Sequence, residues 1–291
     1  MQTIGVIGLG NMGRGMALSL ARGGFRVLGT DAAAAAREAV AAEGIAVAAS
    51  AREIWDSCEI VVLSLPTAEI VEAVLLGPDG PLRGARPDLL VIDTSTSHPD
   101  TTRRVAAALE PAGIALIDAP VSGGPKGAHA GTLTMVIGGT DAALARAEPV
   151  LAAMSATRVH VGGVGAGHVT KIANNLLCAA HLLTAAEAVR MARDAGVDPV
   201  RLLAGINAGS GRSGVTQVNF PTWVLNGAFD SGFTMKLMRK DVRLAESLID
   251  ALGLDLPVAA EVARLWREST EAAPDSEDFN RIVALQLDPA R

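Results

Sequence analysis

A lysine and an asparagine one helical turn apart are the residues in this chain best suited to proton transfer. They occur in the stretch VTKIANNLL, as Lys171 and Asn175. Side chains four residues apart lie on the same face of a helix, so the amine and the carboxamide are expected side by side. A lysine whose pKa is lowered by burial or by a nearby cation can exchange protons, which an arginine effectively cannot. From this spacing alone, a solvated helix end remains the alternative.

Lysine is rare in this sequence, which makes its positions informative. Besides Lys171, only Lys126, Lys236 and Lys240 occur, against many arginines. Where arginine is the usual surface cation, a lysine is expected to be needed as a lysine. Lys236 and Lys240 are also four residues apart, and that pattern alone favours a solvated charged face.

A glycine-rich turn near the N-terminus predicts a dinucleotide site. TIGVIGLGNMGRGMA places three glycines in the G-x-G-x-x-G spacing, directly after a strand pattern and before a helix pattern. These glycines allow a tight turn, a close approach to a pyrophosphate and close packing of helix on strand, while the helix N-terminus attracts the phosphates. The residues expected to contact the cofactor here are Gly8, Leu9, Gly10, Asn11, Met12 and Gly13.

An acidic residue at the end of the next predicted strand indicates which dinucleotide binds. FRVLGTD ends on Asp31, about 20 residues after the glycines, where a ribose-binding carboxylate is expected. A carboxylate accepts hydrogen bonds from ribose hydroxyls and repels a 2′-phosphate, and the next arginine is Arg37. NAD is therefore expected as the cofactor in preference to NADP.

Three further turns follow apolar runs, where ligands bind in a doubly wound sheet. SLPT places Leu65 and Pro66 beside the cofactor, and DTSTSHP presents the hydroxyls of Ser95 and Thr96. DAPVSGGPKGA contains Ser122, Gly123 and Gly124, whose backbone N–H groups are expected to hold a carboxylate. Each stretch alone also fits ordinary turn chemistry.

The elements that must position these residues fall into two halves. Strand patterns occur at 3–7, 26–30, 60–64, 89–93, 115–118, 133–137 and 158–161, with helical patterns between several of them, including 12–22, 32–43 and 101–110. This alternation predicts a mostly parallel, doubly wound Rossmann-type domain over residues 1–162. Residues 163–291 are expected to form an all-α domain, entered by a long interdomain helix over 169–195 and continued by helices near 199–208, 235–252 and 256–267.

Composition excludes several classes of function. The 291 residues carry a net charge of −6, without the clustered basic charge that nucleic acids or anionic membranes require. No stretch approaches the roughly 18 uninterrupted apolar residues that a membrane span requires, and the apolar start lacks a basic signal-peptide region. Two isolated cysteines, Cys58 and Cys178, and five histidines without ligand spacing predict no metal site. We expect a cytoplasmic protein.

Taken together, the motifs resemble those of the β-hydroxyacid dehydrogenases, which include 3-hydroxyisobutyrate dehydrogenase, tartronate semialdehyde reductase and the related 6-phosphogluconate dehydrogenase. GLGNMGRGMA, DTSTSHP, DAPVSGGPKGA, GAGHVTKIANN and KDVRLA match the family's elements in order over nearly the whole chain. The resemblance implies a Rossmann-type domain, a helical domain, and homodimers or homotetramers formed largely through the helical domains.

The resemblance also implies a role for each matching residue. Lys171 matches the catalytic lysine, and Asn175 the asparagine that orients a small carboxylate substrate. Ser122, Gly123 and Gly124 match the turn that binds its carboxylate, whereas Thr96 and Lys240 match residues near the nicotinamide. INAGSGRSG is similar to a stretch of 3-hydroxyisobutyrate dehydrogenases, which implies that Arg212 faces the substrate.

The reaction expected from this match is reversible hydride transfer between NAD and a small 3-hydroxyacid, with Lys171 as general acid and base. Lys240 is a candidate for the cation that lowers the pKa of Lys171. Reduction of 2-hydroxy-3-oxopropionate or another short semialdehyde is an alternative, because TQVNFPTWV at 216–224 departs from the 3-hydroxyisobutyrate pattern. Oxidative decarboxylation, imine reduction and a catalytically silent NAD-binding module are further alternatives, and the retained Lys171 disfavours the last two.

Overall fold

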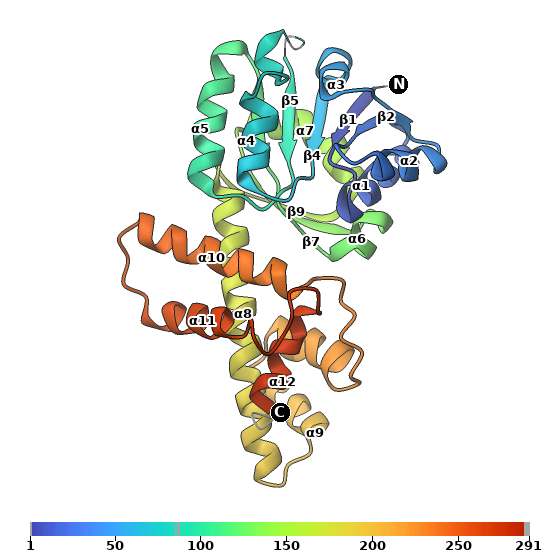
Figure 1. The fold of residues 1–291 in the computed structure, drawn as a ribbon. Coiled ribbons are helices and arrows are strands. Elements are labelled where there is room, and N and C mark those ends of the chain that lie inside the picture. Colours follow the sequence, from blue (N-terminus) through green and yellow to red (C-terminus); the bar gives the residue numbers. More distant parts are fainter. Residues whose placement is uncertain (1, 85, 87, 288–291) are drawn as a thin grey trace. The chain divides into compact units, whose positions relative to one another are not determined.

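The computed structural model describes residues 2–84, 86 and 88–287, and the chain divides into two compact units, Met1–Lys171 and Ile172–Arg291. The first unit contains the sheet and the second is helical (Figure 1). The predicted combination of a Rossmann-type domain and an all-α part is confirmed. The boundary predicted between the dinucleotide-binding domain, residues 1–162, and the helical domain, residues 163–291, stays a prediction.

Nine strands of the described residues form one sheet in the order β3-β2-β1-β4-β5-β6-β8-β7, with β9 paired to β8. The strands from β1 to β6 pair in parallel, whereas β8 runs antiparallel to β6 and β7. The order reverses between β1 and β4, which creates a crevice for a ligand beyond their carboxyl ends. The strands are β1 (Thr3–Ile7), β2 (Arg26–Thr30), β3 (Ala46–Val47), β4 (Ile60–Leu63), β5 (Leu90–Asp93), β6 (Ala115–Asp118), β7 (Val121–Ser122), β8 (Leu133–Gly138) and β9 (Ser155–Gly162).

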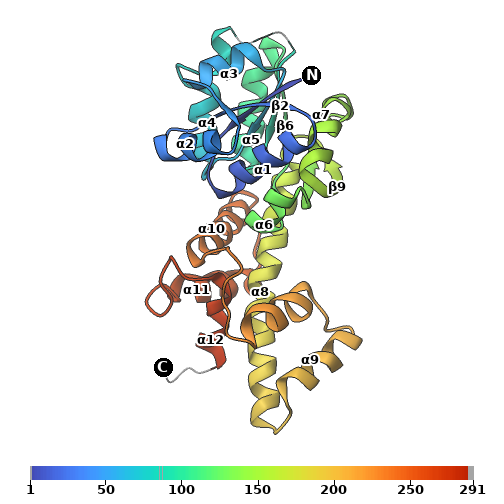
Figure 2. The same ribbon diagram turned by 90° about the vertical axis from the view of Figure 1, so that its right-hand side faces the viewer.

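Helices cover both faces of this sheet (Figures 1 and 2). Along β4, Ile60 and Val62 join the apolar cluster that includes α1 and α7, whereas Val61 and Leu63 join the cluster of α3, α4 and α5. Because successive strand residues point to opposite faces, burial on both sides explains the uninterrupted apolar run IVVL. The helical segments of this unit are α1 (Asn11–Arg22), α2 (Ala34–Ala42), α3 (Ala51–Ser57), α4 (Ala68–Leu76), η1 (Pro81–Arg83), α5 (Pro99–Leu109), η2 (Glu110–Ala112), α6 (Gly124–Ala130) and α7 (Asp141–Met154).

The strands predicted at 3–7, 26–30 and 115–118 appear with those bounds. The two-residue strands β3 and β7 were not predicted, because pairing with a neighbouring strand defines them and no alternating pattern does. Helix α7 was also not predicted. It contains Pro149, which normally argues against a helix interior.

The helical unit is built around the long helix α8 (Ala166–Asp194), whose first turns belong to the first unit. Leu182 of α8, Phe220 and Trp266 are fully buried in the unit's apolar core. Among the described residues, α8 is the one helix long and apolar enough to span a membrane, but 44% of its most apolar window is buried within the protein. These contacts identify α8 as a core helix. The other segments are α9 (Pro199–Ala208), η3 (Val215–Val224), α10 (Met235–Ala251), α11 (Pro257–Glu268), η4 (Phe279–Arg281) and α12 (Ile282–Leu287).

The segment η3 is a π-helix over the residues that depart from the 3-hydroxyisobutyrate pattern. Leu225, which caps the C-terminus of this segment, donates its backbone N–H to the Phe220 carbonyl at 2.9 Å, a bond between residues five positions apart. Pro221 lies inside the segment and cannot donate a backbone bond. Such helices are rare and are frequently found at functional sites, so the sequence departure coincides with an unusual local structure.

Candidate active site

The glycine-rich turn joins β1 to α1, and sterics explain two of its glycines. Gly8 has φ +93°, and a Cβ there would lie 2.2 Å from the Ser64 carbonyl oxygen. A Cβ on Gly13 would lie 1.8 Å from the Gly8 carbonyl oxygen. Side chains are therefore excluded at both positions. In contrast, a Cβ on Gly10 would meet nothing within 4 Å, so the protein leaves open space beside this backbone.

The surroundings of this turn fit a dinucleotide. Gly10 caps α1 without any side-chain bond, and the first N–H groups of a helix have no acceptor within the helix. Asp31 follows β2, and its carboxylate accepts the Leu9 N–H at 2.6 Å and the Ala33 N–H at 2.8 Å. An open backbone, a helix N-terminus and a held carboxylate thus lie at one turn, as the binding of pyrophosphate and ribose requires.

The loops after β4 and β5 are joined at the same edge of the sheet. The Leu65 N–H donates to the Ser95 hydroxyl at 3.0 Å. Pro66 is exposed, and Leu65 and Thr96 are half-buried. The structure therefore brings these three predicted cofactor contacts to the carboxyl ends of neighbouring strands.

Lys171 and Ser122 are in direct contact. The ammonium nitrogen of Lys171 donates to Ser122 Oγ at 2.9 Å, and only 8% of the lysine is exposed. Ser122 ends β7, and Gly123 and Gly124 follow with φ values of +122° and +63°, which favour glycine. The buried lysine excludes the solvated helix end. The sheet-side turn and the start of α8 therefore present one hydroxyl and one amine together.

The helical unit holds the predicted asparagine by a carboxylate. Asn175 is 5% exposed, and its Nδ2 donates to Asp241 Oδ2 at 2.5 Å. The other oxygen of Asp241 lies 3.3 Å from Lys240 Nζ. The carboxylate of Asp241 thus places an opposite charge beside Lys240. That Lys240 lowers the pKa of Lys171 stays a prediction. Arg212 is exposed between α9 and η3.

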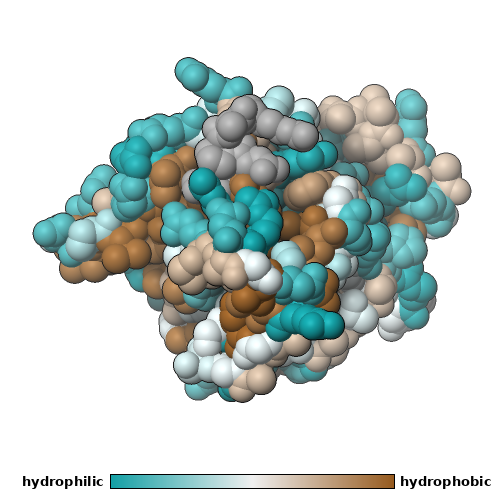
Figure 3. Space-filling view, turned by 90° about the horizontal axis from the view of Figure 1, so that it is seen from below, coloured by the Kyte–Doolittle hydropathy of each residue, from teal (hydrophilic) through white to brown (hydrophobic). Residues whose placement is uncertain are grey.

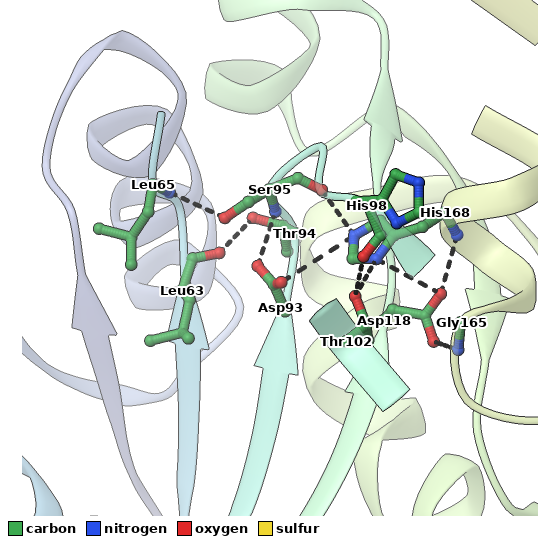
Figure 4. Close-up of polar contacts among 10 residues, drawn as sticks. All are labelled: Leu63, Leu65, Asp93, Thr94, Ser95, His98, Thr102, Asp118, Gly165 and His168. Atoms are coloured by element: carbon green, nitrogen blue, oxygen red, sulfur yellow. Dashed lines mark hydrogen bonds and ion pairs between the residues drawn. The ribbon is translucent and has the colours of Figure 1, made fainter. Parts of the chain in front are cut away.

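Two buried carboxylates in a polar network at the strand ends, Asp93 and Asp118, were not identified as functional from the sequence (Figure 4). Asp118 accepts the backbone N–H of Gly165 at 2.7 Å and that of His168 at 2.8 Å. Burial raises the pKa of the Asp118 carboxyl, whereas His168 and these N–H donors oppose the rise. Asp93 accepts the Ser95 N–H at 3.0 Å. The available signal was that Asp93 and Asp118 each end an apolar strand, where a carboxylate is unusual.

Comparison with known proteins agrees with this geometry. A model described as the NAD binding domain of 6-phosphogluconate dehydrogenase matches residues 3–163, and one described as NAD-binding of NADP-dependent 3-hydroxyisobutyrate dehydrogenase matches residues 165–286. The 3-hydroxyisobutyrate dehydrogenase of Pseudomonas aeruginosa is 36% identical in an alignment of length 293 that covers 98% of each chain. The chain belongs to the β-hydroxyacid dehydrogenase family.

Two further relatives agree with this assignment. The NAD-dependent L-serine dehydrogenase of Pseudomonas aeruginosa is 34% identical in an alignment of length 298 that covers 100% of this chain and 99% of that enzyme. A structure of Mycobacterium tuberculosis 3-hydroxyisobutyrate dehydrogenase with L-serine has a TM-score of 0.92 at 36% identity and covers 98% of both chains. This β-hydroxyacid dehydrogenase is therefore an oxidoreductase that acts on a CH–OH group and uses NAD.

Proposed function

We propose that this β-hydroxyacid dehydrogenase interconverts short 3-hydroxyacids and their semialdehydes, with Lys171 as the general base in oxidation and the general acid in reduction. The observation that carries this proposal is the buried Lys171 ammonium, 2.9 Å from the Ser122 hydroxyl. A buried lysine that contacts a hydroxyl is suited to exchange protons.

The residues of the chain then have separate tasks. When bound, NAD supplies the nicotinamide ring that accepts a hydride from the carbinol carbon. Neutral Lys171 removes the hydroxyl proton as the carbonyl bond forms, and the ammonium returns that proton in reduction. Asn175 orients the substrate, and its contact with Asp241 supports this role because it fixes the carboxamide. A fixed orientation increases the fraction of bound substrate that can react.

The substrate carboxylate is proposed to bind at Ser122, Gly123 and Gly124, with Arg212 as a second contact. Gly123 is exposed and Gly124 half-buried, and their positive φ values turn the backbone between β7 and α6. Backbone N–H groups in such a turn attract an anion. The exposed guanidinium of Arg212 supports the proposal because it can pair with a carboxylate in two hydrogen bonds.

The proposed substrate class is 3-hydroxypropanoates that carry a small group at C2, of which 3-hydroxyisobutyrate is the leading candidate. Relatives named for 3-hydroxyisobutyrate and for L-serine support this class, because those acids differ only in whether C2 carries a methyl or an ammonium group. Reduction of 2-hydroxy-3-oxopropionate is the alternative within the same chemistry.

We propose that the cofactor contacts are Gly8, Leu9, Gly10, Asn11, Met12, Gly13, Asp31, Leu65, Pro66, Thr96 and Lys240. The Asp31 carboxylate favours NAD over NADP, because a 2′-phosphate beside it would be repelled. Arg37 supports this preference. Its Nη1 donates to the carbonyl oxygens of Asp31 at 2.5 Å and Ala32 at 3.1 Å, which engages the guanidinium with the backbone.

We also propose that the protein is a cytoplasmic homodimer or homotetramer that associates through its helical unit. Viewed from below, hydrophobic side chains gather in patches on the surface (Figure 3). Most of the exposed large apolar side chains belong to the helical unit, among them Leu177, Met191 and Val258, which are 58%, 70% and 75% exposed. Light scattering tests this proposal, because Met191→Glu should lower the molar mass and Ile70→Glu on the first unit should not.

A panel of 3-hydroxyacids with NAD and NADP tests the proposed reaction by absorbance at the wavelength of the reduced cofactor. The Lys171→Ala variant should lose about 10²–10⁴-fold in kcat, the usual contribution of a general acid and base, and should retain NAD affinity. An equal loss of NAD affinity would indicate a structural lysine. If the wild type oxidised no hydroxyacid and still bound NAD, the proposal would be replaced by a catalytically silent NAD-binding module.

A further inference from the structure

His168 is a buried polar side chain to which the proposed chemistry gives no task. It is 0% exposed, so it cannot contact a substrate. Both ring nitrogens nevertheless have partners, as Figure 4 shows: Nδ1 lies 2.8 Å from Thr102 Oγ1, and Nε2 lies 3.0 Å from the Ser95 carbonyl oxygen. Through these two bonds, the imidazole connects the start of α8 to the loop after β5 and to α5.

The partner at Nε2 fixes one proton of this imidazole. The Ser95 carbonyl can only accept, so Nε2 carries the proton and donates it. The Thr102 hydroxyl at Nδ1 also lies 3.3 Å from the His98 carbonyl oxygen, and a hydroxyl can donate or accept, so the imidazole and the hydroxyl are hydrogen-bonded in either direction. Asp93 Oδ2 lies 3.9 Å from Nε2, and Asp118 Oδ2 lies 3.9 Å from Nδ1. These carboxylates border the ring at both nitrogens.

This imidazole joins the start of α8 to the loop after β5, and through Ser95 to the loop after β4. Ser95, whose carbonyl accepts from His168, also accepts the Leu65 N–H through its hydroxyl at 3.0 Å. This bond joins the loops that bear Pro66 and Thr96. The third segment is the first turn of α8, which contains His168 itself and which the Asp118 carboxylate holds by two N–H groups.

Lys171 follows His168 by three residues on α8, and its ammonium reaches the Ser122 turn. We propose that His168 is a positioning residue that holds the lysine-bearing turn of α8 in register with the two cofactor-side loops, an inference that rests on the proposed function. Because catalysis requires aligned reacting groups, a displacement of this turn by about 1 Å can lower turnover about 100-fold.

Two substitutions at His168 separate positioning from mere packing. The Gln side chain offers a donor for the Ser95 carbonyl and an acceptor for the Thr102 hydroxyl, whereas Leu fills the space and makes neither bond. We expect His168→Leu to lower kcat per folded enzyme about 100-fold and His168→Gln to remain within about threefold of the wild type. Thr102→Val, which removes one partner only, should lower kcat about threefold to tenfold and guards against failure of the Leu variant to fold.

Ser155→Ala is the matched control in the same unit. Ser155 is 4% exposed and donates to the Leu151 carbonyl at 2.7 Å, a buried bond outside the His168 network. A purely structural effect lowers the melting temperature in both variants and leaves kcat per folded enzyme unchanged. The inference is overturned if His168→Leu retains wild-type kcat, or if His168→Gln is as impaired as His168→Leu.

Hydrogen exchange provides a readout that does not depend on catalysis. In His168→Leu, the amides of residues 163–171 should exchange at least about tenfold faster, whereas those of β1 should not change. Unchanged or uniformly faster exchange would contradict the inference. If the wild type oxidised no hydroxyacid, the proposed function would fail, whereas the exchange experiment would still decide whether His168 holds the start of α8.

Discussion

Replacement of Asp118 by alanine removes the buried acceptor at the start of α8. The carboxylate is 0% exposed and accepts the N–H groups of Gly165 at 2.7 Å and His168 at 2.8 Å. Each buried N–H without an acceptor costs about 1–3 kcal/mol, so the two bonds together represent about 2–6 kcal/mol. Burial of the Asp118 carboxylate is itself unfavourable, as its raised pKa indicates, and the alanine variant no longer has this cost. The removed cost offsets part of the loss from the two bonds. We therefore expect a net destabilisation of about 3 kcal/mol.

Calorimetry of thermal unfolding measures this loss. For a unit of this size, about 3 kcal/mol corresponds to a fall of about 6–12 °C in the melting temperature. The control is Asp198→Ala, because the exposed Asp198 caps α9 through the Arg201 N–H at 3.0 Å. An exposed cap contributes about 1 kcal/mol. Equal, small losses in the two variants would refute the argument that the burial of Asp118 makes its bonds expensive to lose.

The raised pKa of Asp118 also predicts a pH dependence. Because the folded protein holds this proton more tightly than the unfolded chain, the contribution is complete below the ordinary pKa of 3.8 and is lost as pH rises through the folded value. Relative to the uncharged Asp118→Asn variant, the wild type should therefore lose unfolding free energy as pH rises above 3.8. Urea denaturation at several pH values measures the difference, and an opposite slope would contradict the prediction.

Three further substitutions test the cofactor site, the start of α8 and helix α9. Asp31→Asn removes the charge that repels a 2′-phosphate, so the ratio of kcat/KM for NADP over NAD should rise at least about tenfold, and an unchanged ratio would show that Asp31 does not discriminate. In Gly167→Ala, the new Cβ would lie 2.7 Å from the carbonyl oxygens of Asp118 and Val136, and we expect a loss of about 1–3 kcal/mol in urea denaturation. Gly205→Ala in α9 meets nothing within 4 Å and should instead stabilise by about 0.5–1 kcal/mol.

Local patterns in the chain were sufficient for most of the fold. Apolar runs such as IVVL predicted strands buried on both faces, and the glycine spacing after β1 predicted the turn in which Gly8 and Gly13 admit no side chain. Both signals depend on neighbours in sequence, which is why they are readable without a structure. The edge strands β3 and β7 and the π-helix η3 were not predictable in this way, because tertiary pairing or packing overrides local preference there.

For the site, the sequence by itself determined which residue types are available: Lys171 and Asn175 on one helix face, Asp31 after the second strand, and the Ser122 turn. Only the tertiary structure decided their contacts. Lys171 reaches Ser122 from 49 positions away, and Asp118 holds an amide 50 positions further along the chain. A parallel sheet brings the carboxyl ends of distant strands to one edge, so buried partners there are chosen by strand order and not by spacing in sequence.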